Sequence, residues 1–198
     1  MNLPNKLTLS RFGLTVGFLA AIFSKVPGRE TIALALFVAA GISDFLDGQI
    51  ARRRNLITNF GILMDPLADK IMVCSAFIAF VELGWFPAWM TVIVVARELS
   101  ITGLRLLAAS KNVVLAAEGY GKHKTISQIV AIISIFVEKI IGLNQWGSVG
   151  QVIFGWQIAN HAWVWWLAES FKWISVALTF ISGSLYLWKN RALYLNDM

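Results

Sequence analysis

Residues 41–69 of the chain read GISDFLDGQIARRRNLITNFGILMDPLAD. Four aspartates stand in this run among apolar neighbours: Asp44, Asp47, Asp65 and Asp69. The first two are three residues apart and the last two are four apart, so each pair shares one face if its segment is helical. Ionisable groups inside apolar helices are costly and usually functional. These carboxylates are therefore the first candidates for the chemistry of the chain.

The composition places this run in a membrane protein. Of the 198 residues, 58% are hydrophobic and 14% are charged, whereas soluble domains carry about 25% charged residues. The mean hydropathy is +0.68, and the chain has nine Trp and thirteen Phe residues. The net charge of +6 could suggest nucleic acid, but the cations lie between apolar runs and form no stripe. We expect no nucleic-acid partner, and we assign the cations to topology and to anionic phosphates.

Six apolar stretches are long enough to span a bilayer, which takes about 20 residues each. They cover residues 7–26, 31–51, 61–83, 87–109, 125–143 and 163–187. Pro27, Gly28, Gly84 and Pro87 lie between them and predict tight connections. We therefore expect an all-α integral membrane protein, a bundle of six transmembrane helices in one domain over 1–198. Residues 1–10 read as an interfacial N-terminal segment, and 144–162 as an outer interfacial loop or short helix anchored by Trp.

The distribution of Lys and Arg predicts the orientation of the bundle. One side of the predicted membrane carries Lys6, Arg11, Arg52, Arg53, Arg54, Lys111, Lys122, Lys124, Lys189 and Arg191. The other side carries Lys25, Arg29, Lys139 and Lys172. Both termini, the 52–60 and 111–124 loops and the polar site are thus expected to face the cytoplasm, in a multi-pass protein of the cell (inner) membrane.

The four aspartates predict a site for divalent metal ions. The connection between their two segments is short, so the two helices are expected to be antiparallel with the carboxylates at the same end. Converging carboxylates repel unless cations lie between them, and hard oxygen ligands suit Mg²⁺ or Mn²⁺. Two ions about 3.5–4 Å apart can clamp the oxygens of a phosphoryl transfer. The alternative is that each aspartate caps a helix or pairs with one of Arg52–Arg54.

The spacing of these residues resembles a known family. The pattern is Asp44-x2-Asp47-Gly48-x2-Ala51-Arg52-x8-Gly61-x3-Asp65-x3-Asp69, which is similar to the motif of the CDP-alcohol phosphotransferases, and the helix layout fits that family over essentially the whole chain. The resemblance implies cleavage of a CDP-linked lipid such as CDP-diacylglycerol, with CMP leaving as an alcohol attacks. It implies that the four aspartates hold the metal ions, that Asp69 is also the base, and that the protein is a homodimer. The residues alone do not distinguish Asp69 from Asp65 as the base.

Further positions match the part of this family that binds the CDP-lipid. The segment Pro4-Asn5-x2-Thr8-x2-Arg11 resembles the family's amino-terminal segment, so Asn5 and Thr8 are expected to contact the CDP moiety. The remaining expected positions are Gly48, Ala51, Arg52, Thr58 and Gly61. The small residues among them would let a flat ligand or a neighbouring helix approach closely. Helix capping remains the alternative for Asn5 and Thr8, and a topological role remains the alternative for Arg52.

The acceptor alcohol is predicted from a second set of cations: Arg97, Arg105, Lys122 and Lys124. Their surroundings resemble the branch of the family that uses glycerol 3-phosphate, and guanidinium and ammonium groups suit a phosphomonoester dianion. Pairing of Arg97 with Glu98 is the structural alternative.

Other functions stay open at this point. Acceptors such as inositol phosphate, serine or phosphatidylglycerol are alternatives within the family. A small ion or proton transporter is the non-enzyme alternative. A relay would spread its acids through the membrane, whereas the four aspartates cluster and Glu30, Glu82, Glu138 and Glu169 lie near the other helix ends.

Overall fold

A computed structural model describes residues 3–54, 59–111, 113, 115 and 120–195 of the chain. Within these ranges it describes the backbone, but not the side chains, of residues 3–8, 44–54, 59–69 and 120–122. The long helices are α1 (Leu3–Ile22), α2 (Arg29–Arg54), α3 (Asn59–Glu82), α4 (Ala88–Ser110), α5 (Tyr120–Gly142) and α7 (Trp163–Lys189). The short helices are α6 (Gly147–Phe154) and α8 (Ala192–Leu195). Between α6 and α7, β1 (Gln157–Ile158) pairs antiparallel with β2 (His161–Ala162). The expected all-α class is therefore confirmed for the described residues.

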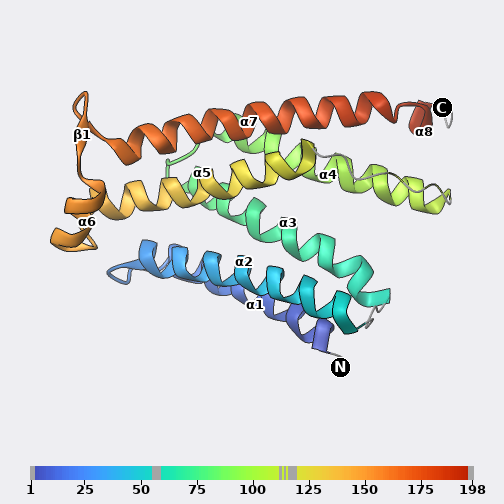
Figure 1. Cartoon of the computed structure of the whole chain (residues 1–198), viewed down its shortest axis with the longest axis horizontal. Helices are drawn as coiled ribbons and strands as arrows, with labels where there is room; N and C mark the ends of the chain where they lie inside the picture. The colour runs from blue at the N-terminus through green and yellow to red at the C-terminus, as the bar shows by residue number, and fades with distance from the viewer. Residues whose placement is uncertain (1–2, 55–58, 112, 114, 116–119, 196–198) are drawn as a thin grey trace.

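The long helices form an elongated bundle with two distinct ends (Figure 1). The N-terminus of α1, the connection from α2 to α3, and the C-terminus lie toward one end, and α6 with its hairpin lies at the other. Helices α1 and α2 form one closely packed pair and α5 with α7 another, while α3 packs on α1 and α4 packs on both α3 and α7. The aspartate-bearing ends of α2 and α3 are thus far from α6.

Aromatic side chains from four helices make the centre of the bundle. The ring of Phe136 on α5 lies 5.0 Å from that of Phe80 on α3 and 6.1 Å from that of Phe18 on α1, measured between centroids. Phe37 of α2 adds a further contact to Phe18 at 6.3 Å. The tilted and edge-on arrangements are the ones that aromatic quadrupoles favour. This cluster joins the α1–α2 pair to α3 and α5.

Glycine ends α3 as its position in the sequence predicts. Gly84 has a φ of +70°, a conformation that glycine adopts without steric cost. The Trp85 N–H donates to the Phe80 carbonyl at 2.8 Å and the Gly84 N–H to the Val81 carbonyl at 3.0 Å, which is the hydrogen-bond pattern of a Schellman cap. The chain then re-enters a helix directly after Pro87. The expected tight connection between the third and fourth helices is confirmed.

The helices coincide closely with the six expected apolar stretches, with two differences in detail. The expected N-terminal lead-in is helical from Leu3 onward and continuous with α1. The outer segment contains both a short helix, α6, and a hairpin. By length and composition, the described part of the chain has two helical segments apolar enough to cross a membrane, His123–Gly142 and Trp163–Lys189.

Helix α6 has an exposed apolar face. Val149, Val152 and Ile153 follow the i, i+3, i+4 spacing of one helical face, and each is more than half exposed, as is Trp156 just beyond the end of α6. Nearby indoles make local hydrogen bonds, because Trp163 Nε1 donates to the Ile153 carbonyl and Trp166 Nε1 donates to the Ile158 carbonyl. The outer segment is therefore ordered around tryptophan while one face of α6 stays uncovered by the described residues.

Candidate active site

The helical backbone places the aspartates at the adjoining ends of α2 and α3. Asp44 and Asp47 lie in the last turns of α2, and Asp65 and Asp69 lie in the first half of α3. The helical geometry on which their pairing depends is thus present at all four positions. Their side chains lie outside the described part of the structure, so the metal-ligand set stays a prediction. Among the side chains that the structure describes, no group of three or more His, Cys, Asp or Glu residues could hold a metal.

The expected CDP-lipid positions also fall outside the described side chains. Asn5 and Thr8 lie in α1, Gly48, Ala51 and Arg52 in α2, and Gly61 in α3. Thr58 lies in the segment 55–58, which the structure does not describe. Their contacts with a CDP-lipid therefore remain predictions.

Two neighbouring helices attach to the aspartate-bearing pair through polar contacts. On α1, Thr15 donates to the Arg11 carbonyl at 2.9 Å and contacts Met72 Sδ of α3 at 3.8 Å, and Arg11 itself is buried. On α3, Lys70 follows Asp69 directly and donates to Thr102 Oγ1 of α4. Thr102 in turn donates to the Glu98 carbonyl at 2.7 Å. A chain of contacts thus runs from the aspartate end of α3 to Glu98.

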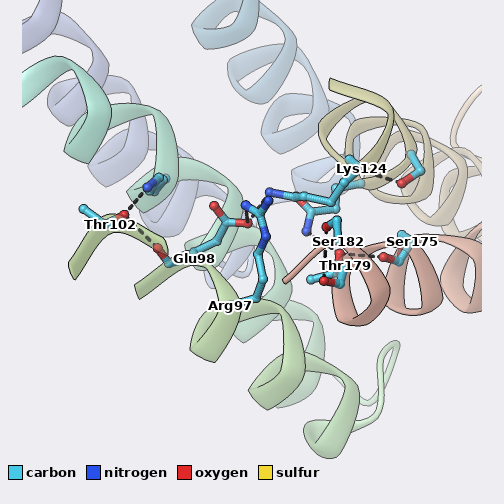
Figure 2. Close-up of polar contacts among 10 residues, drawn as sticks. Arg97, Glu98, Thr102, Lys124, Ser175, Thr179 and Ser182 are labelled. Carbon is cyan, nitrogen blue, oxygen red and sulfur yellow. Dashed lines mark hydrogen bonds and ion pairs between the residues drawn. The ribbon is translucent and has the colours of Figure 1, made fainter. Parts of the chain in front are cut away.

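Glu98 is the centre of a buried charged cluster (Figure 2). Its carboxylate accepts from Lys124 of α5, and Arg97 Nη1 lies 3.3 Å from the same oxygen. Glu98 and Lys124 are 4% and 3% exposed. A buried carboxylate is tolerated only when cations and hydrogen bonds compensate its lost hydration. The cluster therefore joins α4 to α5 at this level of the bundle.

Helix α7 closes the other side of this cluster. Gln128, one turn after Lys124 on α5, is buried and its Nε2 donates to Thr179 Oγ1 of α7 at 3.0 Å. Thr179 Oγ1 donates onward to the Ser175 carbonyl at 2.6 Å. In Figure 2, Arg97 extends from α4 to Glu98 and Lys124, and Thr179 and Ser182 of α7 lie to its other side. Charged and neutral polar groups from three helices thus meet at one level of the bundle.

The structure brings together two of the four cations predicted for the acceptor phosphate. Arg97 and Lys124 meet at Glu98, so the predicted alternative of an Arg97–Glu98 pair is confirmed. Arg105 lies two turns further along α4 and is exposed, with its guanidinium carbon 5.9 Å from the centre of the Tyr186 ring. Lys122 lies in the first turn of α5, with its side chain outside the described set. Binding of a phosphate by any of the four stays a prediction.

Comparison with known proteins identifies the family. A sequence profile of the CDP-alcohol phosphatidyltransferases matches residues 1–181. The chain belongs to the CDP-alcohol phosphatidyltransferase family. Relatives that carry the name CDP-diacylglycerol–glycerol-3-phosphate 3-phosphatidyltransferase include three bacterial proteins. The Bacillus subtilis protein is 36% identical and the match covers 82% of this chain and 95% of the relative. The Mycoplasma pneumoniae protein is 34% identical, and the match covers 89% of this chain and 85% of the relative. The Rickettsia bellii protein is 32% identical, and the match covers 93% of both chains.

The sequence did not predict that Arg97 and Lys124 both pair with Glu98. The available signal was an acidic residue inside an apolar helix, next to an arginine, which already requires a cationic partner. Lys124 could not be chosen as that partner, because the contact joins residues 26 positions apart on different helices. The contacts of Thr102 with Lys70 and of Thr179 with Gln128 were likewise missed.

We predict that Glu98→Gln lowers the thermal stability of the detergent-solubilised protein. The substitution leaves two cations without the carboxylate that compensates them, and breaking a buried pair in this way costs roughly 3–5 kcal/mol. The matched control is Glu169→Gln, because Glu169 pairs with Lys172 but is about one third exposed, where pairs contribute about 0–1 kcal/mol. Equal melting temperatures for the two variants would contradict the central place given to Glu98.

Proposed function

We propose that this protein transfers the phosphatidyl group of CDP-diacylglycerol to glycerol 3-phosphate, giving phosphatidylglycerophosphate and CMP. Membership of the family and the names of the relatives support the reaction class and both substrates. The structural observation that carries the choice of acceptor is the meeting of Arg97 and Lys124 at one level of the bundle. An acceptor that bears its own phosphate requires such cations, whereas serine does not.

Asp44, Asp47, Asp65 and Asp69 are the residues proposed to hold the metal, as two ions of Mg²⁺ or Mn²⁺. Two observations support the fit: the helical backbone puts all four at the adjoining ends of α2 and α3, and four carboxylates supply the hard oxygen donors that these ions prefer. When bound, the ions would neutralise the negative charge of the phosphates at the scissile bond.

The remaining chemistry is assigned to residues of the chain. Asp69 takes the proton from the attacking hydroxyl of glycerol 3-phosphate, as the family motif implies. The hydroxyl oxygen forms a bond to the lipid-side phosphorus, and the bond from that phosphorus to the CMP oxygen breaks, with the electron pair leaving on CMP. Asn5, Thr8, Gly48, Ala51, Arg52, Thr58 and Gly61 are proposed to hold the CDP-lipid. Rate enhancement then comes from positioning and charge compensation, as in phosphoryl transfer generally.

Arg97, Arg105, Lys122 and Lys124 are proposed to bind the acceptor phosphate. Arg97 supports this proposal most directly, because its Nε is buried and has no hydrogen-bond partner among the described residues. A buried donor left unpaired costs about 1–3 kcal/mol, which an anionic oxygen would recover. The chain of contacts from Lys70 through Thr102 to Glu98 connects this region to the aspartate end of α3.

We further propose that the six long helices span the cell membrane with both termini and the site facing the cytoplasm. The excess of Lys and Arg at the aspartate end supports this orientation. At the opposite end, the exposed apolar face of α6 and the surrounding tryptophans suit an interfacial position on the outer side. Residues 1–198 form a single domain in this proposal, and the protein is a homodimer, which native mass spectrometry in detergent would test.

The reaction is tested by presenting the purified protein with CDP-diacylglycerol and, in turn, radiolabelled glycerol 3-phosphate, inositol phosphate, serine or phosphatidylglycerol. We expect a lipid product only, or at least tenfold faster, with glycerol 3-phosphate, because the alternatives lack its charge or its shape. Equal or better use of a competitor would overturn the choice of acceptor. Chelation of divalent ions is expected to stop the reaction, and so is Asp69→Asn, which cannot accept the proton. Full activity of that variant would remove Asp69 from the mechanism.

The orientation is tested with single cysteines and a membrane-impermeant maleimide. In a Cys74→Ala background that retains activity, Ser110→Cys at the end of α4 should react in inverted vesicles and not in intact cells. Gln157→Cys in the outer hairpin is the matched reporter and should react in intact cells. Labelling of both positions from the same side would contradict the proposed topology.

A further inference from the structure

Gly183 of α7 lies directly against the side chain of Arg97. A Cβ atom built on Gly183 would stand 2.7 Å from Arg97 Cγ and 3.6 Å from Arg97 Cβ. These atoms belong to the base of the arginine side chain, so they can retreat only if the whole side chain moves. Gly183 is itself buried. The absence of a side chain at this position therefore determines where Arg97 can lie.

The same face of α7 also contacts α5. Thr179 is one helical turn before Gly183, and its hydroxyl receives the hydrogen bond from Gln128. Gln128 is one turn from Lys124 on α5, so the two share a helix face. We refer to Thr179 and Gly183 together as the α7 face. It touches the helix that carries Arg97 and the helix that carries Lys124.

A pocket beside the α7 face provides space into which a displaced Arg97 side chain can move. The pocket has a volume of about 260 Å³ and lies between α4 and α7, with Arg97, Thr179 and Gly183 in its lining. A methyl group at position 183 can thus move Arg97 toward this space without forcing the helices apart. The expected consequence is a misplaced guanidinium in a bundle that still folds.

We propose that the α7 face is a positioning element for the acceptor phosphate: Gly183 sets the place of Arg97, and Thr179 sets the place of the α5 turn that carries Lys124. This inference rests on the proposed function. It assigns a role in acceptor binding to two residues that lie more than 100 positions after the aspartate motif in the sequence. Neither residue touches the substrate in this account, so they are positioning residues and not catalytic ones.

The test is Gly183→Ala, assayed with both substrates varied separately. We expect the KM for glycerol 3-phosphate to rise on the order of 100-fold, the cost that a misplacement of about 1 Å can carry, while the KM for CDP-diacylglycerol changes less than about twofold. The matched control is Gly103→Ala on α4, because a Cβ there meets no described atom within 4 Å. It should behave as the wild type.

A double mutant separates steric displacement of Arg97 from other effects. If Gly183 acts through Arg97, adding Gly183→Ala to Arg97→Ala should change the KM for glycerol 3-phosphate no further, because the clash is gone. Thr179→Val, which keeps the side-chain shape and removes the hydroxyl, should also raise that KM selectively, and it serves as the test if Gly183→Ala does not fold.

The outcomes distinguish this inference from the proposed function. If the wild type does not use glycerol 3-phosphate, the proposed function fails. If the wild type uses it and Gly183→Ala leaves its KM unchanged, or raises the KM of both substrates equally, only the positioning role is overturned. If Thr179→Val is the variant tested, an unchanged KM for glycerol 3-phosphate likewise overturns only the positioning role.

Discussion

A carboxylate buried between apolar helices must be compensated, and in this chain Glu98 meets that requirement with two cations from different helices. Loss of hydration makes an isolated buried charge prohibitively costly, so the arrangement of α4 and α5 must keep Lys124 beside Glu98. Helix α7 then packs against both, through Gly183 on Arg97 and Thr179 on Gln128. The Glu98 cluster and its neighbours on α7 thus join α4, α5 and α7 at one level of the bundle.

The predicted metal ligands and the predicted acceptor cations come from different helices. Helices α2 and α3 bring four aspartates to their adjoining ends, and α4 and α5 bring cations toward the same region, with Lys70 and Thr102 as the contact between α3 and α4. This division matches what a transferase with two phosphate-bearing substrates requires. In the proposed function, metal ions held by carboxylates compensate the donor's diphosphate, and arginine and lysine bind the acceptor's phosphate directly.

Local sequence patterns predicted the elements of the fold well. The apolar stretches bounded by glycine and proline predicted the six long helices, and Gly84 predicted the end of α3. These sequence patterns are informative because the interactions that form a helix or a cap act over only a few residues. The family was predicted in the same way from a short motif, the spacing of Asp44, Asp47, Asp65 and Asp69. The pairing of Glu98 with Lys124, and the packing of Gly183 on Arg97, could not be predicted, because each joins helices whose relative position is a property of the whole bundle. A glycine in an apolar helix carries no sign of which side chain it faces.

We propose that the four aspartates hold a pair of divalent ions that the transfer requires. The most direct measurement is electron paramagnetic resonance of Mn²⁺ titrated into the detergent-solubilised protein. We expect two bound ions per chain with a spin-coupled spectrum, since ions in such sites lie about 3.5–4 Å apart. We also expect Asp65→Asn to abolish the coupling and the activity together. A single uncoupled Mn²⁺ in the active wild-type protein, or an unchanged spectrum in Asp65→Asn, would contradict a two-ion site at the aspartates.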